Sequence, residues 1–111
     1  MDKQQITNLI KKYGSPLYVF HDAEFIENYE HLCRAMRGYY PNYNPGYSYK
    51  TNYTPHICKL VKRLGGYAEV VSDMELWVAL QCGYENSKII YNGPCKGKML
   101  EDHLLNGGIL N

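Results

Sequence analysis

The chain has 111 residues, the length of one small domain, and its twelve Lys and Arg residues nearly balance eleven Asp and Glu residues, for a net charge of +1. This balance, with no basic block, disfavours a nucleic-acid or membrane surface as the main partner. The polar start, MDKQQITNLIKKYG, has no signal-peptide core, and no run reaches the roughly 18 apolar residues of a membrane helix. We therefore expect a cytoplasmic protein.

The cysteine pattern points away from a disulfide frame or a zinc site. The four cysteines lie far apart, with no C-x-x-C pair and no H-x-x-x-H partner, at Cys33, Cys58, Cys82 and Cys95. We expect free, partly buried thiols of a reducing compartment and no metal.

The first third of the chain predicts a strand and a helix. PLYVFH, residues 16–21, is an apolar run with its strand centred on 17–20. After Asp22 as N-cap, the apolar residues recur on one helical face, which predicts a helix over 23–37. Gly and Pro in RGYYPNYNPG end it.

The next segments repeat this order. The Tyr-rich YSYK predicts a strand over 47–50, and Thr54 with Pro55 opens a helix over 55–64, which Gly-Gly ends. Further strands are predicted at 67–71 and 88–91, and further helices at 73–81, behind a Ser72–Glu75 capping box, and at 97–106. GGILN, at the end, begins another strand.

Strands that alternate with helices at this pitch are typical of parallel βα units with right-handed crossovers. We expect 47–50, 67–71 and 88–91 to be parallel neighbours in that order. A complete (β/α)8 barrel needs about 250 residues. The chain is therefore either a small open α/β domain or the first part of a longer barrel enzyme.

Four polar side chains stand where these strands end: Lys50, Glu69, Ser72 and Asn92. In parallel α/β folds the ligand site lies at this edge, so we expect Lys50, Glu69 and Asn92 to converge there, with the lysine amine turned to the barrel interior and not to bulk water. Each residue also has an ordinary explanation. Most lysines are solvent-exposed, a strand glutamate is common, Ser72 caps a helix and Asn92 suits a turn.

The combination suits the capture of a carbonyl group. A lysine amine attacks an aldehyde only when it is unprotonated, which a pocket of aromatic rings favours, and a nearby carboxylate balances the cationic product or moves a proton. The common cofactor that takes such a lysine as its covalent anchor is pyridoxal phosphate (PLP). The sequence has no G-x-G-x-x-G, no Walker lysine and no H-E-x-x-H.

Five stretches carry a family resemblance: GSPLYVFH, YSYKTNYTP, LGGYAEVVSDMELWVAL, CGYENSKIIYNGPCK and GGILN. In this order they resemble the front part of the fold-type III, alanine-racemase-like PLP-dependent decarboxylases, and most of all diaminopimelate decarboxylase. The resemblance implies the first βα units of a (β/α)8 TIM barrel. It divides the chain into an N-terminal segment, 1–22, whose strand belongs to a C-terminal β domain in the family, and a partial PLP-binding barrel, 23–111.

The resemblance also implies roles for individual residues. Lys50 matches the lysine that forms a Schiff base with PLP, and Glu69 matches the acidic position beside it, so both are candidate catalytic residues. Ser72 and Asn92 match positions at the cofactor rim and, with Lys50, are candidate cofactor-binding residues. Glu75 is expected to support the site or cap its helix.

The implied activity is decarboxylation of an amino acid, meso-diaminopimelate to lysine and CO2, by a cytoplasmic homodimer of the full-length protein. The stacking histidine, the phosphate loop and the substrate-specificity helix of the family lie beyond these residues, so we expect the 111-residue chain alone to be inactive. Alternatives are an ornithine- or arginine-type decarboxylase, another PLP-binding barrel that carries the cofactor or racemises its substrate, and a non-catalytic α/β binding domain.

Overall fold

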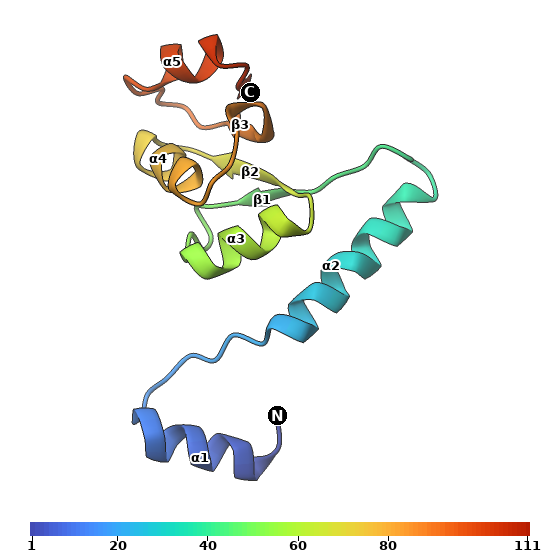
Figure 1. The fold of residues 1–111 in the computed structure, drawn as a ribbon, viewed down its shortest axis with the longest axis vertical. Coiled ribbons are helices and arrows are strands. Elements are labelled where there is room, and N and C mark those ends of the chain that lie inside the picture. The colour runs from blue at the N-terminus through green and yellow to red at the C-terminus, as the bar shows by residue number, and fades with distance from the viewer. The chain divides into compact units, whose positions relative to one another are not determined.

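The computed structural model describes residues 1–111 and divides them into two compact units, Met1–Glu30 and His31–Asn111. The first unit contains helix α1, Lys3–Tyr13, and the start of α2, Asp22–Arg37. The second contains the end of α2 and every strand (Figure 1). No helix of the chain is long and apolar enough to cross a membrane.

Helix α1 was not among the predicted elements, although its start carries a clear signal. The Asp2 carboxylate accepts a hydrogen bond from the Gln5 backbone N–H at 2.8 Å, and the Gln5 side chain accepts one from the Asp2 N–H at 2.9 Å. This capping box satisfies backbone donors that the first turn leaves free. Gly14, at φ 85°, ends the helix and donates to the Ile10 carbonyl.

The predicted strand at 17–20 is wrong: this segment connects α1 to α2 without regular structure. A strand requires a hydrogen-bonded partner, and the sheet of this chain lies wholly in the second unit. The apolar residues instead pack locally, with the Phe20 and Phe25 rings 5.3 Å apart. That this segment joins a β domain, and that the chain divides after residue 22, both stay predictions.

The second unit is a four-stranded parallel sheet in the order β1-β2-β3-β4. Its strands are β1 Gly46–Ser48, β2 Tyr67–Val70, β3 Ile89–Tyr91 and β4 Ile109–Leu110. Between them lie α3 Pro55–Arg63, α4 Asp73–Gln81, the 3-10 turn η1 Asn86–Lys88 and α5 Leu100–Leu105. The predicted parallel order is confirmed, and the last helix is shorter than the predicted 97–106.

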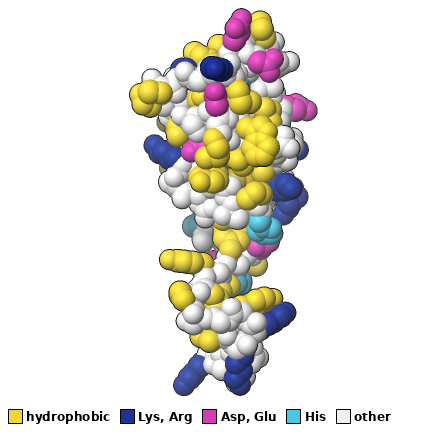
Figure 2. Space-filling view, turned by 90° about the vertical axis from the view of Figure 1, so that its left-hand side faces the viewer, with side chains coloured by type: hydrophobic (Ala, Val, Ile, Leu, Met, Phe, Trp, Pro, Cys, Tyr) yellow, Lys and Arg dark blue, Asp and Glu magenta, His cyan; other side chains and the backbone are white.

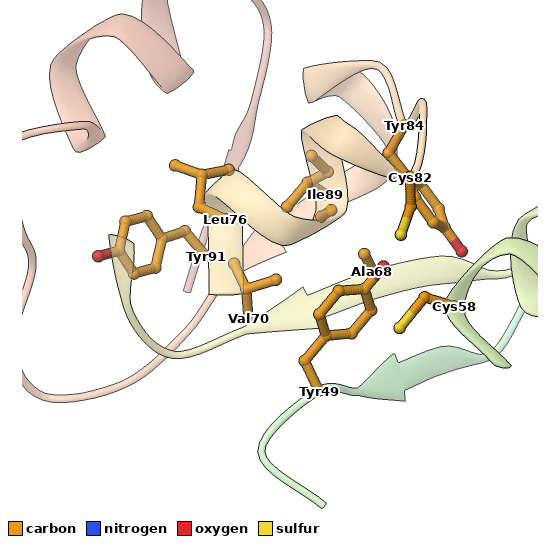
Figure 3. Packing of buried hydrophobic residues seen from close by; sticks show 10 residues of the cluster. Tyr49, Cys58, Ala68, Val70, Leu76, Cys82, Tyr84, Ile89 and Tyr91 are labelled. Atoms are coloured by element: carbon orange, nitrogen blue, oxygen red, sulfur yellow. The ribbon is translucent and has the colours of Figure 1, made fainter. Parts of the chain in front are cut away.

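One face of the sheet is buried and the other is open. Along β2 and β3 every second side chain is buried, because α3 and α4 pack on that face (Figure 3). The core there consists of Tyr49, Cys58, Ala68, Val70, Leu76, Ala79, Cys82, Tyr84, Ile89 and Tyr91. On the opposite face Gly46 lies against Glu69 and Ile90, which are only partly buried.

Candidate functional site

Lys50 lies in a tight turn at the end of β1. The Ser48 carbonyl accepts hydrogen bonds from the Thr51 N–H at 3.3 Å and from the Thr51 hydroxyl at 2.7 Å, which closes the turn around Lys50. The Tyr47 hydroxyl donates to the Asn52 carbonyl at 2.9 Å across the same turn. The backbone of Lys50 is thus positioned by contacts local to β1 and the turn after it.

The sheet ladder reaches one residue beyond β1 and sets the direction of the side chains. The Tyr49 N–H donates to the Glu69 carbonyl at 2.9 Å, and the Tyr49 ring is fully buried against Cys58 and Ala68 under α3 (Figure 3). Burial raises the pKa of Tyr49 far above its ordinary value, so the phenol stays neutral. Lys50 follows Tyr49 in the turn, outside the residues of β1.

Lys50 is exposed to solvent. The expectation that its amine is turned away from bulk water is therefore not met in this chain. The physical reason is that Lys50 lies in the turn after β1, outside the core that α3 and α4 cover.

Two of the predicted site residues meet directly. The Asn92 side-chain amide, at the end of β3, donates to the Glu69 carboxylate on β2 at 2.9 Å. The Asn92 backbone N–H donates to the Val70 carbonyl at 2.7 Å, and its side-chain oxygen accepts from the Gly93 N–H at 2.7 Å. These three bonds fix both the position and the orientation of the Asn92 amide.

Gly93 is required by this arrangement. Its φ of 97° lies in the left-handed region, and a Cβ there would lie 2.9 Å from the Val71 carbonyl oxygen. A side chain at this position would push the loop after β3 away from β2, and the amide of Asn92 away from Glu69.

Ser72 is engaged in the cap of α4. Its hydroxyl accepts a hydrogen bond from the Glu75 N–H at 3.3 Å, as the capping box predicts. The Glu75 carboxylate, 5% exposed, accepts from the Val71 N–H at 2.8 Å instead of from the backbone of Ser72. Glu75 is thus a capping residue in this structure, while the cofactor-binding role of Ser72 stays a prediction.

Ser48 is a candidate that the sequence reasoning missed. Its hydroxyl is buried and has no hydrogen-bond partner, and the residue is in register with Glu69 on β2. A buried hydroxyl without a partner is uncommon, because desolvation then has no compensation. The signal that could have found it is the strand period of two, which puts Ser48 on the face opposite to Tyr47.

The carboxyl ends of β1, β2 and β3 therefore bring together an amine and a carboxylate held by an amide, and Ser48 adds a hydroxyl that is buried and unpaired. These groups fit a cofactor that carries an aldehyde, because the amine can bind it covalently and the carboxylate can balance a positive charge. Lys50, Glu69, Asn92 and Ser48 are the residues that would hold such a group.

The comparisons with known proteins agree with this chemistry. The family described as pyridoxal-dependent decarboxylase, pyridoxal binding domain, matches residues 26–109. Diaminopimelate decarboxylase of Methanothermobacter thermautotrophicus is 33% identical over 85 residues, which are 77% of this chain and 20% of that protein.

Solved structures give the same result. Diaminopimelate decarboxylase from Methanocaldococcus jannaschii, in complex with L-lysine, aligns with a TM-score of 0.77 and 30% identity over 92% of this chain and 24% of that one. SrLDC, in complex with PLP and cadaverine, aligns with a TM-score of 0.75 and 28% identity over 88% and 25%. The chain thus spans about a quarter of these relatives.

The predicted fold, the first βα units of a barrel, and the predicted resemblance are both confirmed. The chain belongs to the pyridoxal-dependent decarboxylase family and matches its pyridoxal-binding domain.

Proposed function

We propose that this chain is the N-terminal part of a PLP-dependent amino-acid decarboxylase, with Lys50 as the covalent anchor of the cofactor. The observation that carries the proposal is the placement of Lys50. It lies in the turn at the carboxyl end of β1, and the hydrogen-bonded pair of Glu69 and Asn92 lies at the carboxyl ends of β2 and β3. In parallel α/β folds this end of the strands is where ligands bind.

The residues of the chain have distinct parts in this proposal. PLP, when bound, supplies an electron sink that allows the substrate to lose its carboxylate as CO2. The Lys50 amine would hold the cofactor covalently. The Glu69 carboxylate balances positive charge beside Lys50, while Asn92 keeps that carboxylate in place. Ser48 has a buried hydroxyl that no group of the chain uses.

We further propose that the substrate is an amino acid with a second amine, with meso-diaminopimelate converted to lysine and CO2 as the first candidate. The relatives at about 30% identity include several diaminopimelate decarboxylases. One diaminopimelate decarboxylase structure holds L-lysine, and the SrLDC structure holds PLP and cadaverine. An ornithine- or arginine-type substrate is the alternative. A cytoplasmic homodimer of the longer protein, with the remaining barrel supplied by further chain, is part of the same proposal.

The test is covalent trapping. The purified chain is mixed with PLP and treated with borohydride, and peptide mapping locates the trapped cofactor. We expect Lys50 to be modified in preference to Lys98, an exposed lysine after β3, and Lys50→Ala to abolish that peptide. Equal modification of both lysines would contradict a built site at Lys50.

A CO2-release assay with meso-diaminopimelate completes the test. We expect no turnover by the 111-residue chain, because it provides the anchor and part of the rim but few groups for a phosphate. A longer chain with the whole barrel should turn over, and Lys50→Ala should abolish that activity. Turnover that survives Lys50→Ala would overturn both the anchor role and the proposed function.

A further inference from the structure

The loop after β3, residues 93–99, is tied to the sheet and to α4 by one half-buried carboxylate. Asp73, the first residue of α4, accepts a hydrogen bond from the Tyr91 hydroxyl at 2.9 Å and from the Met99 N–H at 3.3 Å. Burial raises the pKa of Tyr91, so its hydroxyl keeps the proton that it donates. Gly97 lies directly against the Asp73 carboxylate, where no side chain fits.

Within this fixed loop, Lys96 turns inward. Its ammonium group lies 5.2 Å from the centre of the Tyr91 ring and donates hydrogen bonds to two main-chain oxygens. One is the Tyr91 carbonyl oxygen at 3.1 Å, and the other, at 2.9 Å, belongs to the terminal carboxylate of Asn111, the last residue of this 111-residue chain. These oxygens stand at the carboxyl ends of β3 and β4. Hydrogen bonds from a charged donor are stronger than neutral ones, and the ring adds an electrostatic contact. Lys98, two residues on, is exposed.

The contacts of Lys96 lead directly to the candidate site. Tyr91, whose carbonyl it binds, precedes Asn92, and the same carbonyl accepts the Asn111 N–H at 3.2 Å. Asn92 in turn holds the Glu69 carboxylate. A displacement of the Tyr91 peptide would therefore move the Asn92 amide and loosen its bond to Glu69.

We propose that Lys96 is a positioning residue for this site: its ammonium group joins the carboxyl ends of β3 and β4 and so fixes the Asn92 amide on Glu69. Only the purpose of the site, which is to bind the cofactor, rests on the proposed function. The contacts themselves belong to the chain without a cofactor.

The experiment compares three variants of the full 111-residue chain by NMR, without cofactor. Lys96→Met removes the ammonium group, Lys96→Arg keeps a charged donor, and Lys98→Met removes the same charge from an exposed position of the same loop. Two signals are followed: hydrogen exchange of the Asn111 amide and the side-chain amide resonances of Asn92. The first reports the β3–β4 junction, and the second reports the bond to Glu69.

Lys96→Met should raise Asn111 exchange by about tenfold and move the Asn92 resonances toward those of a free amide, since a charged hydrogen bond at the junction is lost. Lys96→Arg should restore both signals, and Lys98→Met should change neither. If Lys96→Met does not fold, Lys96→Gln takes its place with the same expectation.

Two results would overturn the proposal: no difference between Lys96→Met and Lys98→Met, or faster Asn111 exchange with unmoved Asn92 resonances. The second would leave Lys96 as a clamp with no effect on the site. Failure of PLP to attach to Lys50 in the unchanged chain would count against the proposed function alone, because both NMR signals are measured without cofactor.

Discussion

At the scale of single residues, the Glu69 carboxylate is held in one orientation by its neighbours. One carboxylate oxygen accepts the Asn92 amide, so the other remains available to a bound group. Asn92 cannot rotate to release it, because its own side-chain oxygen is held by the Gly93 N–H. The carboxylate is therefore oriented before any ligand arrives, which lowers the entropy cost of binding one.

The glycine after Asn92 gives the first prediction at this scale. Gly93→Ala should destabilise the second unit by about 2–4 kcal/mol, because it combines a positive φ with a collision against Val71. Gly65→Ala is the matched control: φ is 84° there too, but nothing lies within 4 Å, so the loss should be only about 1–2 kcal/mol. Urea unfolding of both variants measures the difference, and equal losses would contradict the collision.

The buried thiol of Cys58 gives the second prediction at this scale. Burial raises its pKa from 9.0 to about 11. Below pH 9 the thiol is neutral in both the folded and the unfolded chain. Above pH 9 the unfolded chain loses the proton first, so rising pH favours unfolding until the folded thiol also ionises near pH 11. Over this range the free energy of unfolding should fall by up to about 2–3 kcal/mol.

Unfolding free energies of the unchanged chain and of Cys58→Ala, measured at about pH 8 and about pH 10.5, test this linkage. Cys58→Ala should show the smaller fall with pH, although other buried groups, Cys82 among them, still contribute. An identical fall in both proteins would show that Cys58 does not titrate as its burial requires.

At the scale of elements, the sequence predicted most of the second unit and less of the first. Strands 46–48, 67–70 and 89–91 and helices 55–63 and 73–81 were found because their apolar periodicity coincides with burial in one core. The run at 17–20 is also apolar, but a strand forms only beside a partner strand, and the local sequence pattern does not show whether one is present.

Side-chain partners were predicted less completely than elements. The meeting of Glu69 with Asn92 followed from strand order alone. Two other sets of contacts could not be predicted in this way: the hydrogen bond from the Val71 N–H to the Glu75 carboxylate, and the bonds from Lys96 to two main-chain oxygens. They depend on loop conformations, which the periodicity of the sequence does not determine. Helix α1 was missed although Ile6, Leu9, Ile10 and Tyr13 recur at helical spacing behind its cap, so the sequence contained both signals.

That cap gives the prediction at this scale. Asp2→Ala should lower the stability of α1 by about 0.5–2 kcal/mol, because the Gln5 N–H loses its acceptor. Asp2→Asn keeps an oxygen at the same place and should retain most of the helix. Backbone chemical shifts of residues 3–13 report the helical population. Equal populations in Asp2→Ala and the unchanged chain would mean that the capping box does not support α1.

At the scale of the whole molecule, much apolar surface remains exposed. Figure 2 shows hydrophobic side chains on the surface between charged ones. The sheet has two edges, β1 and β4, and the β4 residues Ile109 and Leu110 are 38% and 47% exposed. An exposed apolar edge strand is a template for pairing with another chain.

We therefore expect the 111-residue chain to self-associate as its concentration rises, in part through β4. Leu110→Lys should weaken this association by about tenfold or more, because paired edges would bring like charges together. Leu105→Lys makes the same change on α5, where the leucine is 80% exposed and no strand edge is present. Sedimentation velocity over a concentration series compares them. A monomer at every concentration, or an equal effect of both variants, would contradict this role of β4.

The burial of three cysteines makes it possible to label the chain at a single position near the site. Three of the four thiols are buried, and only Cys95 is exposed. Cys95 stands beside Lys96 in the loop after β3. A thiol-reactive fluorophore would therefore label the folded chain at this one position without any engineered change. Its emission would report movement of that loop in real time, as the cofactor arrives or as the rest of a barrel closes over the open face.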